Sequence, residues 1–182
     1  MSIVNKEHRL KIGVMGSAAD LNYSRQINQL ANDIGAEIAK TDNITVYGAE
    51  KDYDSLSTSA ARGAKKQGGL TIGVTYGKDK NIFDKKNTDV CIVTGMERGG
   101  GREFVLVNSC DAIICVSGGS GTLNEISIAY QSNIPIIVLE NTGGWSEKLG
   151  RKYLDARKRV KCEKAKTARQ AVKKAIKLAR KE

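Results

Sequence analysis

Short apolar runs alternate with amphipathic segments along the whole chain, and this alternation limits the fold more than any other feature. Continuous apolar runs are typical of parallel strands that are buried on both faces, whereas half-exposed strands alternate apolar and polar residues. Such runs occupy residues 11–17, 43–48, 70–76, 90–95, 112–116, 135–140 and 160–165. Apolar residues at helical spacing predict helices over 24–40, 57–67, 101–109, 122–131 and 167–179. We therefore expect an α/β fold, a Rossmann-like three-layer sandwich with an open, mainly parallel sheet.

Length and composition predict a single domain. The chain has 182 residues, of which 40% are apolar, so residues 1–182 can bury one core, with residues 1–9 as a flexible, polar start. No apolar run reaches the roughly 18 residues of a membrane helix, and the N-terminus lacks the apolar region of a signal peptide. We therefore expect a cytoplasmic protein with no membrane partner.

The cysteine and histidine content indicates neither a metal site nor a disulfide framework. The chain has four cysteines, none of them in a C-x-x-C pair, and one histidine, His8, in the polar N-terminal stretch. Structural metal sites gather several such ligands at short spacing, and disulfide frameworks belong to small secreted domains. We expect His8 to be an exposed residue.

The positive charge is concentrated at the C-terminal end. The net charge is +10, and residues 148–182 alone hold fifteen Lys or Arg and three Asp or Glu. This segment could contact a polyanion, or it could be the solvated face of a helix. Thr167 and Gln170 have the spacing of a capping box before an amphipathic run. The second interpretation is therefore favoured, and nucleic acid is not an expected partner.

Three glycine-bearing turns follow predicted strands, at the edge where open parallel sheets bind ligands. They contain Gly16 and Ser17, Gly95, and the residues Gly118, Gly119, Ser120, Gly121 and Thr122. In the last turn, glycines let the backbone approach a ligand closely. The helix that follows presents unpaired N–H groups, which commonly bind phosphate. These residues are the predicted binding site for a phosphorylated small molecule.

Two charged residues near this turn each have a functional and a structural interpretation. Glu125 could contact a bound phosphosugar, or it could form a capping box with Thr122 and serve only the helix end. Arg102 follows three glycines; it could be an exposed arginine, or it could contact the ligand or Glu125 through a charge-assisted hydrogen bond.

At these residues the sequence resembles a known superfamily. The stretch GGSGTLNE, residues 118–125, is similar to the PGGxGTxxE motif of the "lonely guy" phosphoribohydrolases, and Arg102 lies 23 positions before Glu125, as the motif arginine does. The stretches IGVMGSA (12–18), RGAKKQGGLTIGV (62–74), VTGMERGGGR (93–102) and NTGGW (141–145) resemble the molybdenum cofactor carrier branch and its prokaryotic relatives more closely.

The resemblance implies a Rossmann-like fold, a homo-oligomer (dimer or tetramer) and a pocket for a phosphorylated heterocycle. It implies a molybdopterin-type or nucleotide ligand and no required cofactor. In the hydrolases, the residues that match Arg102 and Glu125 are catalytic and cleave nucleoside 5′-monophosphates to the free base and ribose 5-phosphate; in the carriers, the pocket holds its ligand without reaction. Both functions stay open, with binding favoured, while nothing supports a lysine decarboxylase, which would need a Schiff-base lysine.

The sequence departs from the family pattern at three places. Ser117 replaces the motif proline, and Asn124 replaces the first motif glutamate. A second glycine-rich turn of the family reads GAEKDYDS at residues 48–55, where acidic residues replace glycines. Because acidic side chains repel phosphate, either this loop turns away from the site or the ligand differs from the usual one.

Overall fold

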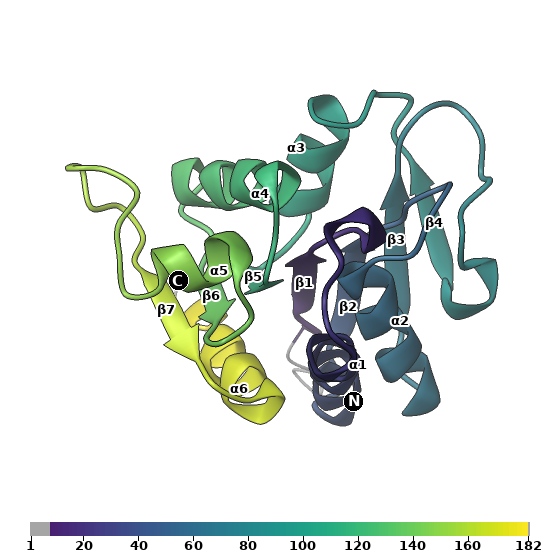
Figure 1. The fold of residues 1–182 in the computed structure, drawn as a ribbon. Helices are drawn as coiled ribbons and strands as arrows, with labels where there is room; N and C mark the ends of the chain where they lie inside the picture. The colour runs from purple at the N-terminus through teal and green to yellow at the C-terminus, as the bar shows by residue number, and fades with distance from the viewer. Residues whose placement is uncertain (1–7, 182) are drawn as a thin grey trace, which may run out of the picture.

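Seven parallel strands form one open sheet in the computed structural model, which describes residues 8–181 (Figure 1). The strands are β1 (Lys11–Gly16), β2 (Ile44–Gly48), β3 (Thr71–Thr75), β4 (Val90–Val93), β5 (Ala112–Val116), β6 (Ile136–Leu139) and β7 (Cys162–Ala165). Their order across the sheet is β4-β3-β2-β1-β5-β6-β7, and every pairing is parallel. The predicted α/β Rossmann-like fold is confirmed.

Helices cover both faces of the sheet (Figure 1). The helices are α1 (Arg25–Lys40), α2 (Leu56–Lys66), α3 (Gly101–Asn108), α4 (Ser120–Gln131), α5 (Gly144–Leu149) and α6 (Ala168–Ala179). One buried cluster joins α1, α2 and α6 to one face, and a second joins α3 and α4 to the other. The strand order reverses between β1 and β5, where a doubly wound sheet opens a crevice.

Side-chain caps fix three helix starts. Ser24, Ser55 and Thr167 precede α1, α2 and α6, and each side-chain oxygen accepts a hydrogen bond from a backbone N–H in the first turn. Such caps satisfy donors that the helix leaves unpaired. The predicted start of the last helix at Thr167 is therefore confirmed.

The basic segment is folded into the domain. It forms β7 at one edge of the sheet and α6, which buries Ala171, Val172 and Ala175 against the core and leaves its lysines toward solvent. This arrangement agrees with the solvated-face interpretation of the charge.

Three further observations bear on the remaining expectations. No helix among residues 8–181 is long and apolar enough to cross a membrane. All four cysteines are free thiols, and His8 is exposed. The flexibility predicted for residues 1–9 falls almost wholly outside the described residues.

Candidate functional site

A pocket of about 450 Å³ opens at the carboxyl ends of β1 and β5, where the strand order reverses. It is the position at which open α/β sheets bind ligands. The lining residues come from the ends of β1, β2 and β5, from the loop before α3 and from the starts of α3 and α4. They are Gly16, Ser17, Ala18, Leu21, Glu50, Tyr53, Arg98, Gly99, Arg102, Glu103, Gly119, Ser120, Gly121, Thr122 and Glu125.

The turn between β5 and α4 forms one wall of the pocket, and Ser17 holds it in place. Ser117 and Gly118 adopt left-handed conformations, with φ of 57° and 104°. The Gly118 N–H donates to the Ser17 hydroxyl at 2.9 Å, and that hydroxyl donates to the Ser117 hydroxyl at 3.1 Å. Because proline fixes φ near −65°, the observed backbone at position 117 excludes the motif proline.

A second loop supports the turn from behind. The N–H groups of Trp145 and Ser146 donate to the carbonyls of Gly118 and Ser117, each at 3.0 Å. A Cβ atom at Gly144 would lie 2.5 Å from the Gly118 oxygen, so only glycine allows this approach. The NTGGW stretch therefore has a structural role in holding the glycine-rich turn, and it begins the short helix α5, which the sequence did not predict.

The first turn of α4 faces the pocket with unpaired backbone donors. Gly119 is the N-cap residue and supplies no side-chain cap, while Ser120 and Gly121 are exposed. The N–H groups of Ser120, Gly121 and Thr122 lack an acceptor four residues earlier within the helix. Together with the helix dipole, they form a suitable position for an anion.

The capping-box interpretation of Glu125 is wrong. Thr122 is the third residue of α4 and not its cap, so Glu125 lies more than one turn inside the helix. Its side chain lines the pocket with 8% of the residue exposed, and no hydrogen bond joins its carboxyl group to any other described residue. Glu125 is thus a buried carboxyl group that is available to a ligand.

The surroundings of Glu125 favour its protonated form. Burial raises its pKa to about 8 because the charged form loses hydration. The positive charge of Arg102 lowers this pKa, while the nearby Glu103 and Glu50 carboxylates raise it. At neutral pH, Glu125 is therefore mainly a neutral hydrogen-bond donor as well as an acceptor.

Arg102 is buried in an ion-pair network on the opposite wall. Only 3% of the residue is exposed. Its Nη2 lies 3.0 Å from Glu50 Oε1 and 3.0 Å from Glu103 Oε1, and its Nε donates to Glu103 Oε1 at 3.1 Å. The structure brings Arg102 and Glu125 to the same pocket, but the hydrogen bonds of Arg102 go to the two other carboxylates. It is not the exposed arginine of the structural interpretation.

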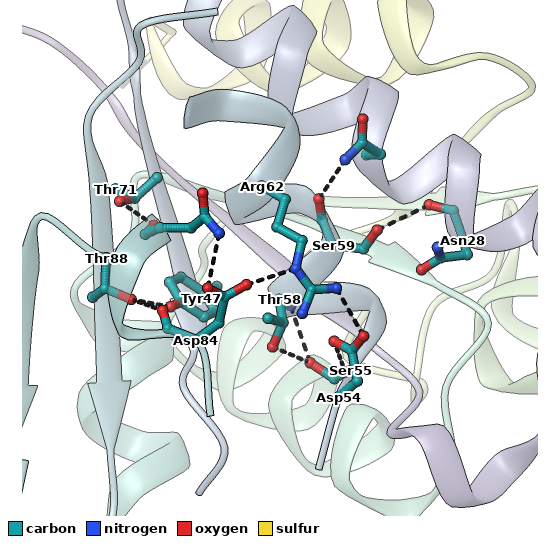
Figure 2. Close-up of polar contacts among 12 residues, drawn as sticks. Asn28, Tyr47, Asp54, Ser55, Thr58, Ser59, Arg62, Thr71, Asp84 and Thr88 are labelled. Atoms are coloured by element: carbon teal, nitrogen blue, oxygen red, sulfur yellow. Dashed lines mark hydrogen bonds and ion pairs between the residues drawn. The ribbon is translucent and has the colours of Figure 1, made fainter. Parts of the chain in front are cut away.

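The acidic loop after β2 divides its carboxylates between the pocket and the scaffold. Asp54 accepts a hydrogen bond from Arg62 Nη1 at 2.7 Å, and Arg62 also donates through Nε to Asp84 at 2.6 Å (Figure 2). Asp54 thus faces α2, whereas Glu50 lines the pocket. The loop does not turn away as a whole, and it places one carboxylate beside the ligand space.

An arginine and two tyrosines stack at the loop that precedes α3. The Arg98 guanidinium lies 5.1 Å from the ring centres of both Tyr53 and Tyr76, which are cation–π distances. Arg98 Nη1 lies 3.5 Å from Glu50 Oε2, an oxygen that is buried and has no hydrogen-bond partner among the described residues. Because Arg98 is 41% exposed at its side chain, it is a mobile cation at the edge of the pocket.

Most residues predicted for the site line this pocket. Gly16, Ser17, Arg102, Glu125 and residues 119–122 do so. Gly118 lies behind the wall and positions it, whereas Gly95 lies outside the pocket lining, in a turn where its N–H donates to the Gly77 carbonyl at 3.0 Å.

Sequence reasoning missed four lining residues that carry charge or an aromatic ring: Glu50, Tyr53, Arg98 and Glu103. Glu50 and Arg98 follow the carboxyl ends of β2 and β4. That edge of the sheet was already expected to hold the site, and it was the available signal for both residues.

A resident metal ion finds no preformed cluster in the part of the chain that the structure describes. No group of three or more His, Cys, Asp or Glu side chains there could hold one. The pocket carboxylates instead pair with arginines.

Comparison with solved structures places the chain beside cofactor-binding proteins. The X-ray structure of TM1055 superposes with a TM-score of 0.81 at 26% identity, covering 92% of this chain and 99% of that one. The molybdenum cofactor binding protein of Rippkaea orientalis gives a TM-score of 0.78 at 25% identity, over 94% and 98% of the two chains. The molybdenum cofactor carrier protein of Chlamydomonas reinhardtii gives 0.76 at 27% identity, over 96% and 100%.

These matches confirm the superfamily that the GGSGTLNE motif indicated and the branch that the longer stretches favoured. A family model agrees over nearly the whole described chain, from residue 9 to residue 175. The chain belongs to the SLOG cluster4 family.

Proposed function

We propose that this protein binds a phosphorylated, pterin-type or nucleotide-like small molecule in the pocket between β1 and β5, as a cofactor carrier or nucleotide-binding protein. The observation that carries the proposal is the first turn of α4, whose exposed residues Ser120 and Gly121 present backbone donors to a pocket of about 450 Å³. A pocket of this size is within the range of small-molecule sites, and a phosphate suits the donors.

The opposite end of the pocket suits the ring system of such a ligand. Tyr53 and Arg98 offer flat π surfaces, and Glu50 offers a carboxylate oxygen that no described residue satisfies by hydrogen bonding. A heterocycle with N–H donors at its edge matches an unsatisfied acceptor. The similarity to proteins described as molybdenum cofactor carriers supports a pterin-type ligand for this end.

The position of Arg102 favours binding over turnover. Its hydrogen bonds to Glu50 and Glu103 hold the guanidinium in the wall of the pocket. An arginine that must follow charge as it develops on a substrate needs a donor directed at that substrate. We therefore assign Arg102 to holding Glu50 and Glu103 in place.

Titration calorimetry with molybdopterin and a panel of nucleoside 5′-monophosphates tests this proposal. At least one ligand should bind the wild type, and Gly121→Asp should abolish binding because its carboxylate would occupy the phosphate position. A carboxylate is favourable at a helix N-terminus, so the variant should stay folded. Gln131→Glu adds the same charge at the far, exposed end of α4 and should bind normally. Unchanged binding by Gly121→Asp would contradict the proposal.

A second function, cleavage of nucleoside 5′-monophosphates, is favoured by one observation: Glu125 is buried, unpaired and in contact with the ligand space. In that reaction water attacks the anomeric carbon, the C–N bond to the base breaks, and base and ribose 5-phosphate are released. Ionised Glu125 would stabilise the oxocarbenium-like state and orient the water.

Incubation with the same nucleotides, followed by chromatography for free base, distinguishes the two functions. Release that is lost in Glu125→Gln and Arg102→Ala would establish the hydrolase. Binding without release would leave the carrier function.

A further inference from the structure

One part of the sheet lacks a cover on the face that carries α3. Val90 and Ile92 of β4 are 44% and 36% exposed. They are in register with Ile72 and Val74 of β3, so all four side chains point to the same face. Strands of parallel sheets are normally buried on both faces, and α3 reaches only as far as β2 and β3. An apolar strip at the β4 edge is therefore left in water.

The other face of the same strands is closed. There Cys91 of β4 packs against a cluster formed by Tyr47, Ala49, Ala61 and Ile82, the last of which belongs to the loop between β3 and β4. The exposed strip is thus specific to one face and does not result from general looseness at this edge.

The strip adjoins a protruding ring and a hollow. Phe104 on α3 is 60% exposed, the largest exposed fraction among the large apolar side chains of the described residues. The carbonyl of Phe104 accepts a hydrogen bond from the Asn108 amide one turn later, and Asn108 lines a hollow of about 320 Å³. The remaining residues of the hollow are Lys11, Val46, Ile72, Ile92, Ser109 and Asp111.

The charges around the hollow cancel. Lys11 and Asp111 are its only charged lining residues, and their side chains pair at 3.3 Å. The face is therefore neutral although the whole chain carries +10, so a second copy of the chain can approach it without the repulsion expected elsewhere. A cation and an anion at one rim also allow exchange of partners across a two-fold axis.

We propose that this face, formed by β4, the outer side of α3 and the hollow, is the contact between two copies of this chain. A two-fold interface requires one surface that fits itself. Here a two-fold axis places Phe104 of each copy in the hollow of the other and covers Val90 and Ile92. A large aromatic side chain that fills an apolar pocket is the usual centre of such an interface.

The contact would also act on the ligand site. Phe104 directly follows Arg102 and Glu103, which form the arginine–carboxylate network in the pocket. Assembly would therefore hold the first turn of α3, and with it one wall of the pocket.

Sedimentation velocity over a dilution series tests the proposal on the full chain. The wild type should sediment as an assembly of two chains or a multiple of two. Phe104→Glu and Ile92→Lys should each raise the dissociation constant of the contact by a factor of about 30 or more, with unchanged far-ultraviolet circular dichroism. Phe83→Glu is the matched control, because Phe83 is also 49% exposed but lies in the loop between β3 and β4, and it should assemble as the wild type does.

Three outcomes would overturn the proposal: a wild type that stays a single chain at all concentrations, an assembly that survives both Phe104→Glu and Ile92→Lys, or equal dissociation in Phe83→Glu. Because folding is monitored separately, a failure to fold would not be mistaken for dissociation. Ile92→Val, which keeps an apolar side chain at the strip, should retain the assembly and supplies the second check.

Discussion

The guanidinium of Arg102 lies directly over Gly48: a Cβ atom at position 48 would be 2.0 Å from Arg102 Nη1. The end of β2 thus has no room for a side chain because the arginine occupies that space. This contact fixes the guanidinium between Glu50 and Glu103, and it explains why one glycine persists in a loop that is otherwise acidic.

Gly48→Ala is therefore expected to displace Arg102 and break its hydrogen bonds to Glu50 and Glu103. Hydrogen bonds to charged groups contribute about 1.5–3 kcal/mol, so the free energy of unfolding should fall by about that amount, measured by urea denaturation. Gly121→Ala is the control, since a Cβ atom there meets no atom within 4 Å. A Gly48→Ala protein as stable as the wild type would show that the arginine relocates without loss.

Ser117→Pro, which restores the family's motif residue, is expected to damage this protein. The φ of 57° at Ser117 is closed to proline, and the substitution also removes the N–H that donates to Thr142 at 2.9 Å. We expect a loss of more than about 1 kcal/mol of stability, together with loss of ligand binding. Ser117→Gly, which tolerates the same φ, should remain folded and bind. Equal behaviour of the two variants in thermal unfolding would contradict the assigned backbone constraint.

Glu125 is expected to make stability depend on pH. Its pKa is about 8 in the folded protein and near the ordinary 4.5 in the unfolded chain. Between these values the folded state binds more protons, so this group lowers the free energy of unfolding as pH rises, by up to about 1.4 kcal/mol per pH unit.

In Glu125→Gln this contribution is absent. Urea unfolding from pH 5 to pH 9 should show the variant gaining stability relative to the wild type up to about pH 8 and holding that difference above it. Glu97→Gln removes an exposed carboxyl group near the same pocket and serves as the control. Parallel pH curves for the wild type and Glu125→Gln would mean that Glu125 ionises freely.

The strands were predictable because burial on both faces leaves a simple signal, an unbroken apolar run such as AIICV in β5. The starts of α1 and α6 were equally accessible, since Ser24 and Thr167 cap them through local hydrogen bonds. Helix α5 escaped because it has six residues and begins at a glycine, and a sequence of that kind carries no clear helical period.

The site was predictable only in part. The glycine-rich turn marks itself locally, but the roles of its neighbours depend on contacts between distant segments. Thr122 and Glu125 have capping-box spacing, yet the left-handed residues before them start α4 three residues earlier and direct Glu125 into the pocket. Glu50 is 52 residues from Arg102, so no local pattern could have paired them.

The most direct test of the central claim, that a phosphate binds the first turn of α4, is a comparison of one ligand with and without its phosphate. The tightest-binding nucleoside 5′-monophosphate and its nucleoside would be titrated into the wild type and into Gly121→Asp. We predict that removing the phosphate weakens binding to the wild type by a factor of about 10 or more and makes no difference to Gly121→Asp. A wild type that binds the nucleoside as tightly as the nucleotide would contradict the claim.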